Sequence, residues 1–383
     1  MKEHWEYKKL GEIGDSELGK TKDSTRNKGS LQPYLCAINV LWDKFDLSNL
    51  KEMKFEDDEK ERYSIKKGDL IICEGGDIGR AAIWSNERPI LYQNALHRVR
   101  FKEGIEARFI LFYLFYLKIN GILDERYGKG VTIKHLVKTS LLSISVPVPP
   151  LSEQKRIVEE LDLLSGIIEK QKQQLKELDT LAQSIFYEMF GDPVTNEKGW
   201  EVKLMQDVVF LKSGDSSSNN LPDGEIPYVK VADMNLEPNK NGIIESSRYV
   251  ELPLGSKLLF PVGTTIFPKR GGAILTNKKR ITKVQICCDL NIMGAIPKEE
   301  IINPLYLFYF FLFLDFSKLI NGSSVPQINN VTINPLKIQI PPLHLQNLFA
   351  EKIEAIEKQK DAITKSIEET QKLFDYTMDK YFG

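Results

Sequence analysis

The chain has 383 residues, of which 42% are hydrophobic and 27% charged, and its formal net charge is −1. This length allows two or three domains, and the composition is that of an ordinary globular protein, which excludes disordered and fibrous classes. The longest apolar runs, residues 109–117 and 305–314, are too short to cross a bilayer, so we expect no membrane contact. A start without a basic-apolar leader and four scattered cysteines without metal-ligand spacing favour a cytoplasmic protein with reduced thiols.

The small net charge hides a partition along the chain. Residues 1–150 carry 25 basic against 22 acidic side chains and residues 200–342 carry 15 against 13, so both stretches are mildly basic. Residues 151–199 carry 6 against 10 and residues 343–383 carry 6 against 8, so both are acidic. Because attraction to phosphate acts over about a Debye length of ~10 Å, a neutral total does not exclude a nucleic-acid partner.

Two globular halves of similar order are predicted, over residues 1–148 and 200–340. Each half opens with a Trp-Glu pair, at Trp5 and Trp200, and continues with a strand, a glycine-rich turn, a second strand and an aromatic helix. The turn lacks the Lys-Ser/Thr of a phosphate-binding loop, so we interpret it as a tight hairpin whose tip can approach a ligand. Residues 192–199 contain Pro, Asn and Gly and are predicted to be a linker.

Residues 149–191 and 341–383 are near-repeats of each other, at a constant offset of 192 residues. Both begin Pro-Pro-Leu, have Gln at the sixth position and end Phe-Gly. Since proline is tolerated only in the first turn of a helix, these prolines mark the start of two long helices. Apolar side chains then alternate at spacings of four and three, which is a coiled-coil pattern interrupted by Gln171 and Lys360. The predicted interface consists of Ile157, Leu161, Leu164, Ile168, Leu175, Leu178 and Ile185 in the first helix, and of Phe349, Ile353, Ile356, Ile363, Ile367 and Phe374 in the second.

The sequence does not contain a recognisable catalytic constellation. The four histidines have no zinc spacing, and no metal or cofactor site is predicted. Asn303-Pro304-Leu305-Tyr306 is weakly similar to an adenine methyltransferase motif, but it lacks the second proline. We interpret Asn303 as a helix N-cap and Pro304 as the first residue of an aromatic helix over residues 303–321. A chain that catalyses a reaction by itself is therefore not expected.

Basic and amide side chains near the turns are the candidates for contacts with DNA. Residues 269–283 contain six basic residues and no acid, which favours a phosphate-binding surface over an ordinary solvated face. Amide and guanidinium groups can also make bidentate contacts with base edges, and Asn94 and Asn291 are expected at matching positions of the two halves. His97, Arg98 and Arg100 are all expected to point outward from one strand. The predicted DNA contacts are Arg80, Asn94, Arg98, Arg100, Lys129, Thr132 and Lys134 in the first half, and Lys269, Arg270, Lys278, Lys279, Arg280, Asn291, Ser324, Gln327 and Asn329 in the second.

This duplicated order resembles the specificity subunit of Type I restriction–modification systems over the whole chain. The resemblance rests on Pro149-Pro150-Leu151-Ser152-Glu153-Gln154 with the heptads behind it, on its repeat at residues 341–346, and on the openings at Trp5 and Trp200. His344-Leu345 departs from the Ser/Ala-Glu pair usual before Gln346. The implied fold class is α/β (α+β), with two similar target-recognition domains joined by two long antiparallel coiled-coil helices in a pseudo-two-fold repeat.

The resemblance also implies a function. Each half would read one part of a bipartite double-stranded DNA target, while residues 149–191 and 341–383 set the spacer and bind two modification subunits. S-adenosylmethionine, ATP and Mg²⁺ would be held by the modification and the restriction/translocase subunits. Exchanging residues 323–330 should then change one half-site only. Two alternatives stay open at this point: a coiled-coil scaffold that presents two protein-binding domains, and the specificity subunit of a related Type II-like system.

Overall fold

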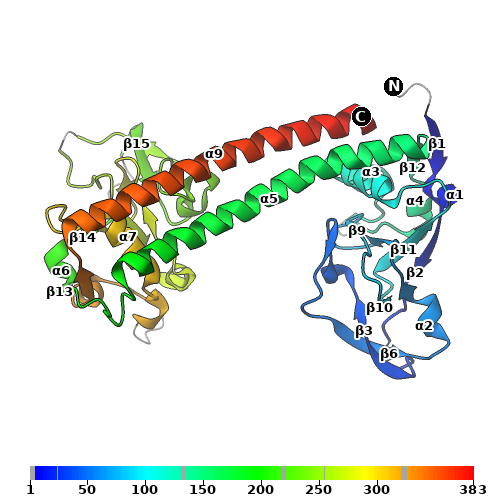
Figure 1. The fold of residues 1–383 in the computed structure, drawn as a ribbon, viewed down its shortest axis with the longest axis horizontal. Coiled ribbons are helices and arrows are strands. Elements are labelled where there is room, and N and C mark those ends of the chain that lie inside the picture. The colour runs from blue at the N-terminus through cyan, green and yellow to red at the C-terminus, as the bar shows by residue number, and fades with distance from the viewer. Residues whose placement is uncertain (1–4, 24, 132–133, 217–220, 254, 321–325) are drawn as a thin grey trace. The chain divides into compact units, whose positions relative to one another are not determined.

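The structure is a computed structural model that describes residues 5–23, 25–131, 134–216, 221–253, 255–320 and 326–383. The chain divides into two compact units: the first comprises Met1–Lys170 with Ser366–Gly383, and the second comprises Gln171–Lys365. Each unit therefore contains one globular half and part of each long helix (Figure 1). Among the helices described, none is long and apolar enough to cross a membrane.

The first unit contains two four-stranded sheets and the aromatic helix α3. One sheet has the strand order β2-β11-β8-β9, the other β6-β3-β10-β7, and β1 pairs with β12 beside them. The main elements are β1 (Glu6–Lys9), β2 (Gly14–Leu18), β3 (Ser30–Leu35), β6 (Lys51–Phe55), β7 (Ser64–Ile65), β8 (Leu70–Cys73), β9 (Ala81–Ile83), β10 (Ile90–Tyr92), β11 (Leu96–Phe101), α3 (Ala107–Ile119), α4 (Lys138–Leu142) and β12 (Ser145–Val148).

The second unit repeats this topology with a shorter second sheet. The order β14-β20-β17-β18 corresponds to β2-β11-β8-β9, and β15 pairs in parallel with β19 as β3 does with β10. Its elements are β13 (Glu201–Leu204), α6 (Met205–Val208), β14 (Val209–Ser213), β15 (Asp223–Val229), β16 (Tyr249–Val250), β17 (Thr265–Pro268), the 3₁₀ helix η7 (Gly271–Thr276), β18 (Arg280–Ile281), β19 (Cys287–Cys288), β20 (Ile292–Pro297), α7 (Pro304–Phe313), α8 (Asn330–Ile333) and β21 (Lys337–Ile340).

A glycine at the end of β2 and another at the end of β14 occupy equivalent places in the two units. Gly19 donates its backbone N–H to Leu96, and Gly214 donates to Ile292. A Cβ on Gly19 would lie 2.4 Å from the carbonyl oxygen of Tyr92, and one on Gly214 would lie 2.0 Å from that of Asp289. Only a residue without a side chain permits this approach of two backbones, so the glycine is needed in both halves.

The aromatic helices α3 and α7 form the core of their units. Phe109 packs against Phe382 with ring centroids 5.3 Å apart, and Phe186 stacks on Tyr306 at 5.5 Å. The predicted cap of α7 is confirmed, because the side chain of Asn303 accepts a hydrogen bond from the N–H of Leu305 at 2.9 Å and Pro304 is the first helical residue. The predicted end of α7 was wrong: the helix stops at Phe313 rather than near residue 321.

The long helices are α5 (Leu151–Phe190) and α9 (Leu343–Phe382), which run in opposite directions within each unit (Figure 1). In the first unit, the hydroxyl of Tyr381 donates to Glu160 at 2.6 Å and accepts from Arg156 at 3.1 Å. In the second unit, the ammonium group of Lys360 lies 2.9 Å from the carboxylate of Asp179. The polar residue that interrupts the stripe of α9 is thus paired with α5 in an ion pair.

Burial along the two helices follows most of the predicted stripe. Ile157, Leu161, Leu164 and Ile168 are buried with Phe374 in the first unit, and Phe349, Ile353 and Ile356 are buried in the second. The stripe shifts by one residue at the end of α5, where Phe186 and Phe190 are buried and Ile185 is only half-buried. There α5 packs against α7 as well as α9, so a two-helix heptad no longer describes its contacts. Leu175, Leu178, Ile363 and Ile367 are also half-buried.

Candidate nucleic-acid interface

In both units the turn after a central strand meets two other segments through the same backbone hydrogen bonds. In the first unit Glu74 donates its N–H to Ala95 at 2.9 Å and accepts at its carbonyl from Leu136 at 2.7 Å. In the second unit Lys269 donates to Asn291 at 2.8 Å and accepts from Ile328 at 2.9 Å. We call this junction the turn site of each unit. Because the backbone hydrogen bonds of the two turn sites match, the side chains of the two units can be compared position by position.

The turn site of the second unit brings together four of the residues predicted from the sequence. Lys269 and Arg270 follow β17, Asn291 precedes β20, and Gln327 forms an antiparallel bridge with Arg270. Arg270 and Gln327 are exposed. Burial lowers the pKa of Lys269, as does the charge of Arg270, and the Lys269 ammonium donates to the hydroxyl of Ser213 at 2.7 Å. The site is therefore a cationic surface with an amide beside it.

Two amide side chains near this site already have partners in the protein. The Nδ2 of Asn291 donates to Asp289 at 2.9 Å, and the Oδ1 of Asn329 accepts from the N–H of Thr332 at 3.1 Å as the N-cap of α8. Asn291 is equivalent to Ala95 rather than to Asn94, so the predicted match of the two asparagines was wrong by one residue.

Lys279 does not belong to the interface, although the run of basic residues predicted that it would. Its side chain is 1% exposed, and its ammonium donates to the carbonyl of Leu314 at 2.5 Å and to Asn277 at 2.6 Å. Burial lowers the pKa of Lys279 to about 8. Asn277 also accepts the N–H of Phe316 at 2.9 Å, so this cluster turns the chain at the end of α7.

The neighbours of Lys279 remain partly accessible. Lys278 is half-exposed. Arg280 is half-buried, and its guanidinium donates to the carbonyl of Lys279 at 2.9 Å. The predicted cluster of residues 269–283 is thus divided, with Lys269, Arg270, Lys278 and Lys283 on the accessible side.

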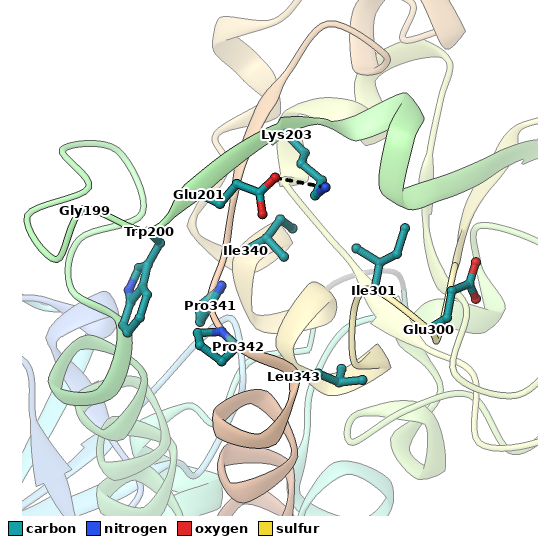
Figure 2. A pocket seen from close by; sticks show the side chains of 10 residues that line it. All are labelled: Gly199, Trp200, Glu201, Lys203, Glu300, Ile301, Ile340, Pro341, Pro342 and Leu343. Atoms are coloured by element: carbon teal, nitrogen blue, oxygen red, sulfur yellow. Dashed lines mark ion pairs between the residues drawn. The ribbon is translucent and has the colours of Figure 1, made fainter.

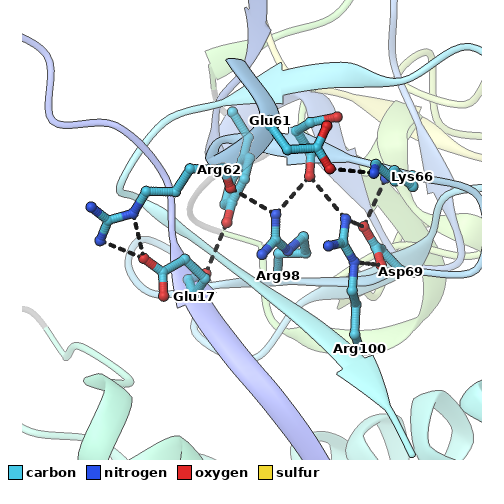
Figure 3. Close-up of polar contacts among 9 residues, drawn as sticks. Glu17, Glu61, Arg62, Lys66, Asp69, Arg98 and Arg100 are labelled. Carbon is cyan, nitrogen blue, oxygen red and sulfur yellow. Dashed lines mark hydrogen bonds and ion pairs between the residues drawn. The ribbon is translucent and has the colours of Figure 1, made fainter. Parts of the chain in front are cut away.

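Arg98 and Arg100 both make hydrogen bonds within the first unit and are only partly exposed (Figure 3). Arg98 donates to the carbonyls of Arg62 and Ser64 at 2.8 and 2.7 Å. Arg100 makes a bidentate pair with Asp69 at 2.7 and 3.0 Å. The expectation that His97 also points outward was wrong, because neighbouring residues of a strand face opposite sides and His97 is fully buried.

The other candidates of the first unit fall into two groups. The guanidinium of Arg80 donates to the carbonyl of Ala37 at 2.7 Å, and the ammonium of Lys134 donates to that of Asp124 at 2.6 Å. Both charged groups therefore bind the protein itself. Lys129 is exposed and Asn94 is half-exposed. Lys129 pairs through its backbone with His135, which places it at the turn site. Thr132 and Ser324 lie outside the described residues.

Sequence reasoning missed Glu74 and His135 at the first turn site. Gly75 forms an antiparallel bridge with His135, just as Arg270 does with Gln327. Burial raises the pKa of Glu74, while the nearby His135 opposes that rise. Aligning the two halves at an offset of 195 residues places Glu74 opposite Lys269. This alignment is the feature of the sequence that could have identified Glu74.

A separate open pocket lies in the second unit, beside β13 and the junction where β21 leads into α9 (Figure 2). Trp200, Ile340 and Pro342 contribute to its wall, and Glu201 pairs with Lys203 at 3.0 Å along one side. Its lining includes none of the predicted DNA contacts, so it is not part of the turn site.

The sequence model of the Type I restriction modification DNA specificity domain matches the chain twice, over residues 2–179 and 197–372. The chain belongs to this family. Each match spans one globular half and part of the following long helix, which is the repeat seen in the sequence and in the two units. This specificity-domain duplication confirms the predicted fold class of two similar recognition domains with long helices.

Relatives of this specificity-domain protein match nearly its full length. A Type I restriction enzyme specificity subunit of Methanocaldococcus jannaschii is 24% identical, with 90% of this chain and 85% of the relative covered. A putative type I restriction enzyme specificity subunit of Haemophilus influenzae is also 24% identical, with 97% and 93% covered.

Solved structures share the fold. The S subunit of a Type I restriction-modification system from M. genitalium matches with a TM-score of 0.60 at 13% identity, covering 99% of this chain and 96% of that one. A chain from a structure of type I R-M complex assembly matches with a TM-score of 0.60 at 18% identity, covering 99% and 97%.

Proposed function

We propose that this chain is the DNA specificity subunit of a Type I restriction–modification system and that it recognises DNA without catalysing a reaction itself. The observation that carries the proposal is the pair of turn sites. The same backbone hydrogen bonds hold different side chains in the two units, which is what two readers of different half-sites require. Membership of the specificity-domain family and relatives of nearly equal length support it.

Each unit would read one half of a bipartite target, and the long helices would set the unread spacer between the halves. The helices also carry large apolar side chains that face solvent in both units: Leu163, Leu373 and Tyr376 in the first, and Leu181, Tyr187 and Leu348 in the second. Exposed apolar side chains on a helix are typical of a protein-binding surface. We assign these surfaces to two copies of a modification subunit, one on each unit.

The chemistry would belong to the partners. The modification subunits would hold S-adenosylmethionine and extrude the target adenine, and restriction/translocase subunits would use ATP and Mg²⁺. This chain would contribute the choice of sequence and the position of the partners on the duplex.

The test is co-expression with a modification subunit encoded beside this gene, followed by single-molecule mapping of methyladenine across the host DNA. We expect a two-part motif with a fixed gap that disappears when this gene is deleted. Co-purification of both proteins without any new methylation would contradict the proposal. It would favour the alternative in which the chain is a coiled-coil scaffold that presents two protein-binding domains.

A further inference from the structure

The two turn sites carry opposite charges at the same backbone position. Glu74 and Lys269 are equivalent by both of their backbone hydrogen bonds. The next residue is Gly75 in the first unit and Arg270 in the second, and each bridges the return segment, at His135 and Gln327 respectively. One acid in the first unit thus replaces two bases in the second.

Glu74 is an acid that the described residues do not pair. Within the described part of the chain its carboxylate makes no hydrogen bond or ion pair, whereas Glu17 and Asp69 of the same unit are paired with Arg62 and Arg100. Burial raises the pKa of Glu74, so keeping a carboxylate there costs free energy. A half-buried acid that makes no hydrogen bond or ion pair among the described residues is suited to an external hydrogen-bond donor.

The residues around Glu74 include a second polar side chain. The imidazole ring of His135 lies close to Gly75, since a Cβ on Gly75 would come within 3.2 Å of it. Lys129 is exposed on the segment paired with His135, through N–H···O bonds of 2.9 and 2.8 Å. The first turn site therefore contains an exposed cation that can bind a phosphate and an acid that a phosphate would repel. We infer that the acid faces something other than the DNA backbone.

Base edges in the major groove supply the two kinds of partner. Cytosine presents only an amino donor, at N4, which a carboxylate accepts, while guanine presents two acceptors, at O6 and N7, which Lys and Arg bind. We propose that Glu74 selects a cytosine in one half-site by accepting from its N4 amino group, whereas Lys269 and Arg270 select a guanine in the other half-site. This inference rests on the proposed function and adds the base preference of each unit.

The first experiment maps methylation by complexes that contain wild-type chain, Glu74→Gln or the control Glu52→Gln, which changes an exposed acid on β6. Glu74→Gln should relax one cytosine position in one half-site, with discrimination reduced roughly tenfold or more, and should leave the other half-site unchanged. Glu52→Gln should reproduce the wild-type motif. An unchanged motif with Glu74→Gln would overturn the cytosine contact while the proposed function stands; a wild-type complex without a two-part motif would overturn both.

A second experiment keeps the wild-type protein and changes the DNA, so it does not depend on how a variant folds. In a duplex with the mapped motif, 7-deazaguanine removes the N7 acceptor of one guanine at a time. Replacement in the half-site read by the second unit should weaken binding roughly tenfold, and replacement in the other should change it less than about twofold. Equal losses in both half-sites, or no loss in either, would overturn the assignment of Lys269 and Arg270 to guanine.

Discussion

The side-chain oxygen of Gln154 accepts the backbone N–H of Glu106 at 2.8 Å, and Gln346 accepts that of Asn303 at the same distance. Each amide also donates to a proline carbonyl at the start of its own long helix, at 2.8 Å to Pro149 and 2.7 Å to Pro341. Gln154 is 1% exposed and Gln346 is fully buried. In both units one glutamine therefore fixes the first turn of a long helix to the start of an aromatic helix.

Replacing either glutamine by alanine should destabilise its unit by about 2–4 kcal/mol, because a buried N–H and a buried carbonyl lose their partners. Gln173→Ala is the matched control, since that amide is exposed and, among the described residues, bonds only Glu177 on its own helix at 3.1 Å. Urea unfolding followed by circular dichroism measures the difference. A cost below about 0.5 kcal/mol for Gln154→Ala and Gln346→Ala would mean that the junction is held by other contacts.

Lys360 should be needed only as the partner of the half-buried carboxylate of Glu357. Its ammonium lies 2.9 Å from Glu357 and from Asp179, whose side chains are 21% and 61% exposed. Lys360→Met should cost about 1–2 kcal/mol by leaving Glu357 unpaired, and adding Glu357→Gln should recover most of that loss. Asp179→Asn should cost less than about 1 kcal/mol because its carboxylate is mostly solvated. The measurement is a double-mutant cycle in urea, and a Met/Gln double variant as unstable as Lys360→Met would refute this account.

The sequence was sufficient for features that repeat or lie close together in the chain. The two long helices begin at Leu151 and Leu343, directly after the proline pairs, and Asn303 caps α7 as its spacing predicted. These features depend on local backbone chemistry, which can be predicted from the residue types alone.

The sequence does not show contacts between distant segments. Arg98 and Arg100 bind residues 31 to 36 positions earlier in the chain, and no local pattern shows those partners. The run around Lys279 reads as uniformly basic, yet Lys279 turns inward toward Leu314, 35 residues later. Glu74 cannot be singled out in the sequence because it is one of many acids in the first half. It stands out only when the matching backbone hydrogen bonds show that it is equivalent to Lys269.

Acid should destabilise the first unit through His97. Burial lowers the pKa of this fully buried imidazole to about 4, and its Nε2 donates to the carbonyl of Leu136 at 2.7 Å. At pH values between the pKa of an unfolded histidine, ~6.5, and the pKa of about 4 in the folded chain, the unfolded chain binds a proton that the folded chain does not. The free energy of unfolding should therefore fall as pH falls through this window, by roughly 3 kcal/mol in total, and level off below it.

Urea unfolding at a series of pH values measures this dependence. His97→Gln should remove that part of the slope, whereas His344→Gln, at an exposed position on α9, should keep it. The same slope in His97→Gln as in the wild-type chain would assign the acid sensitivity to other groups.

The two lysines Lys129 and Lys279 should differ in how they affect binding to DNA. Lys129 is exposed at the first turn site, and a lysine that neutralises one phosphate contributes about 0.9 to the slope of log K against log salt concentration. Lys129→Ala should lower that slope by about 1 and weaken binding to all sequences alike. Lys279→Met should lower stability but leave the slope unchanged, because its buried ammonium binds Leu314 and Asn277. Gel shifts of the complex with modification subunits at several salt concentrations measure both slopes, and a loss of slope in Lys279→Met would show that this side chain reaches phosphate.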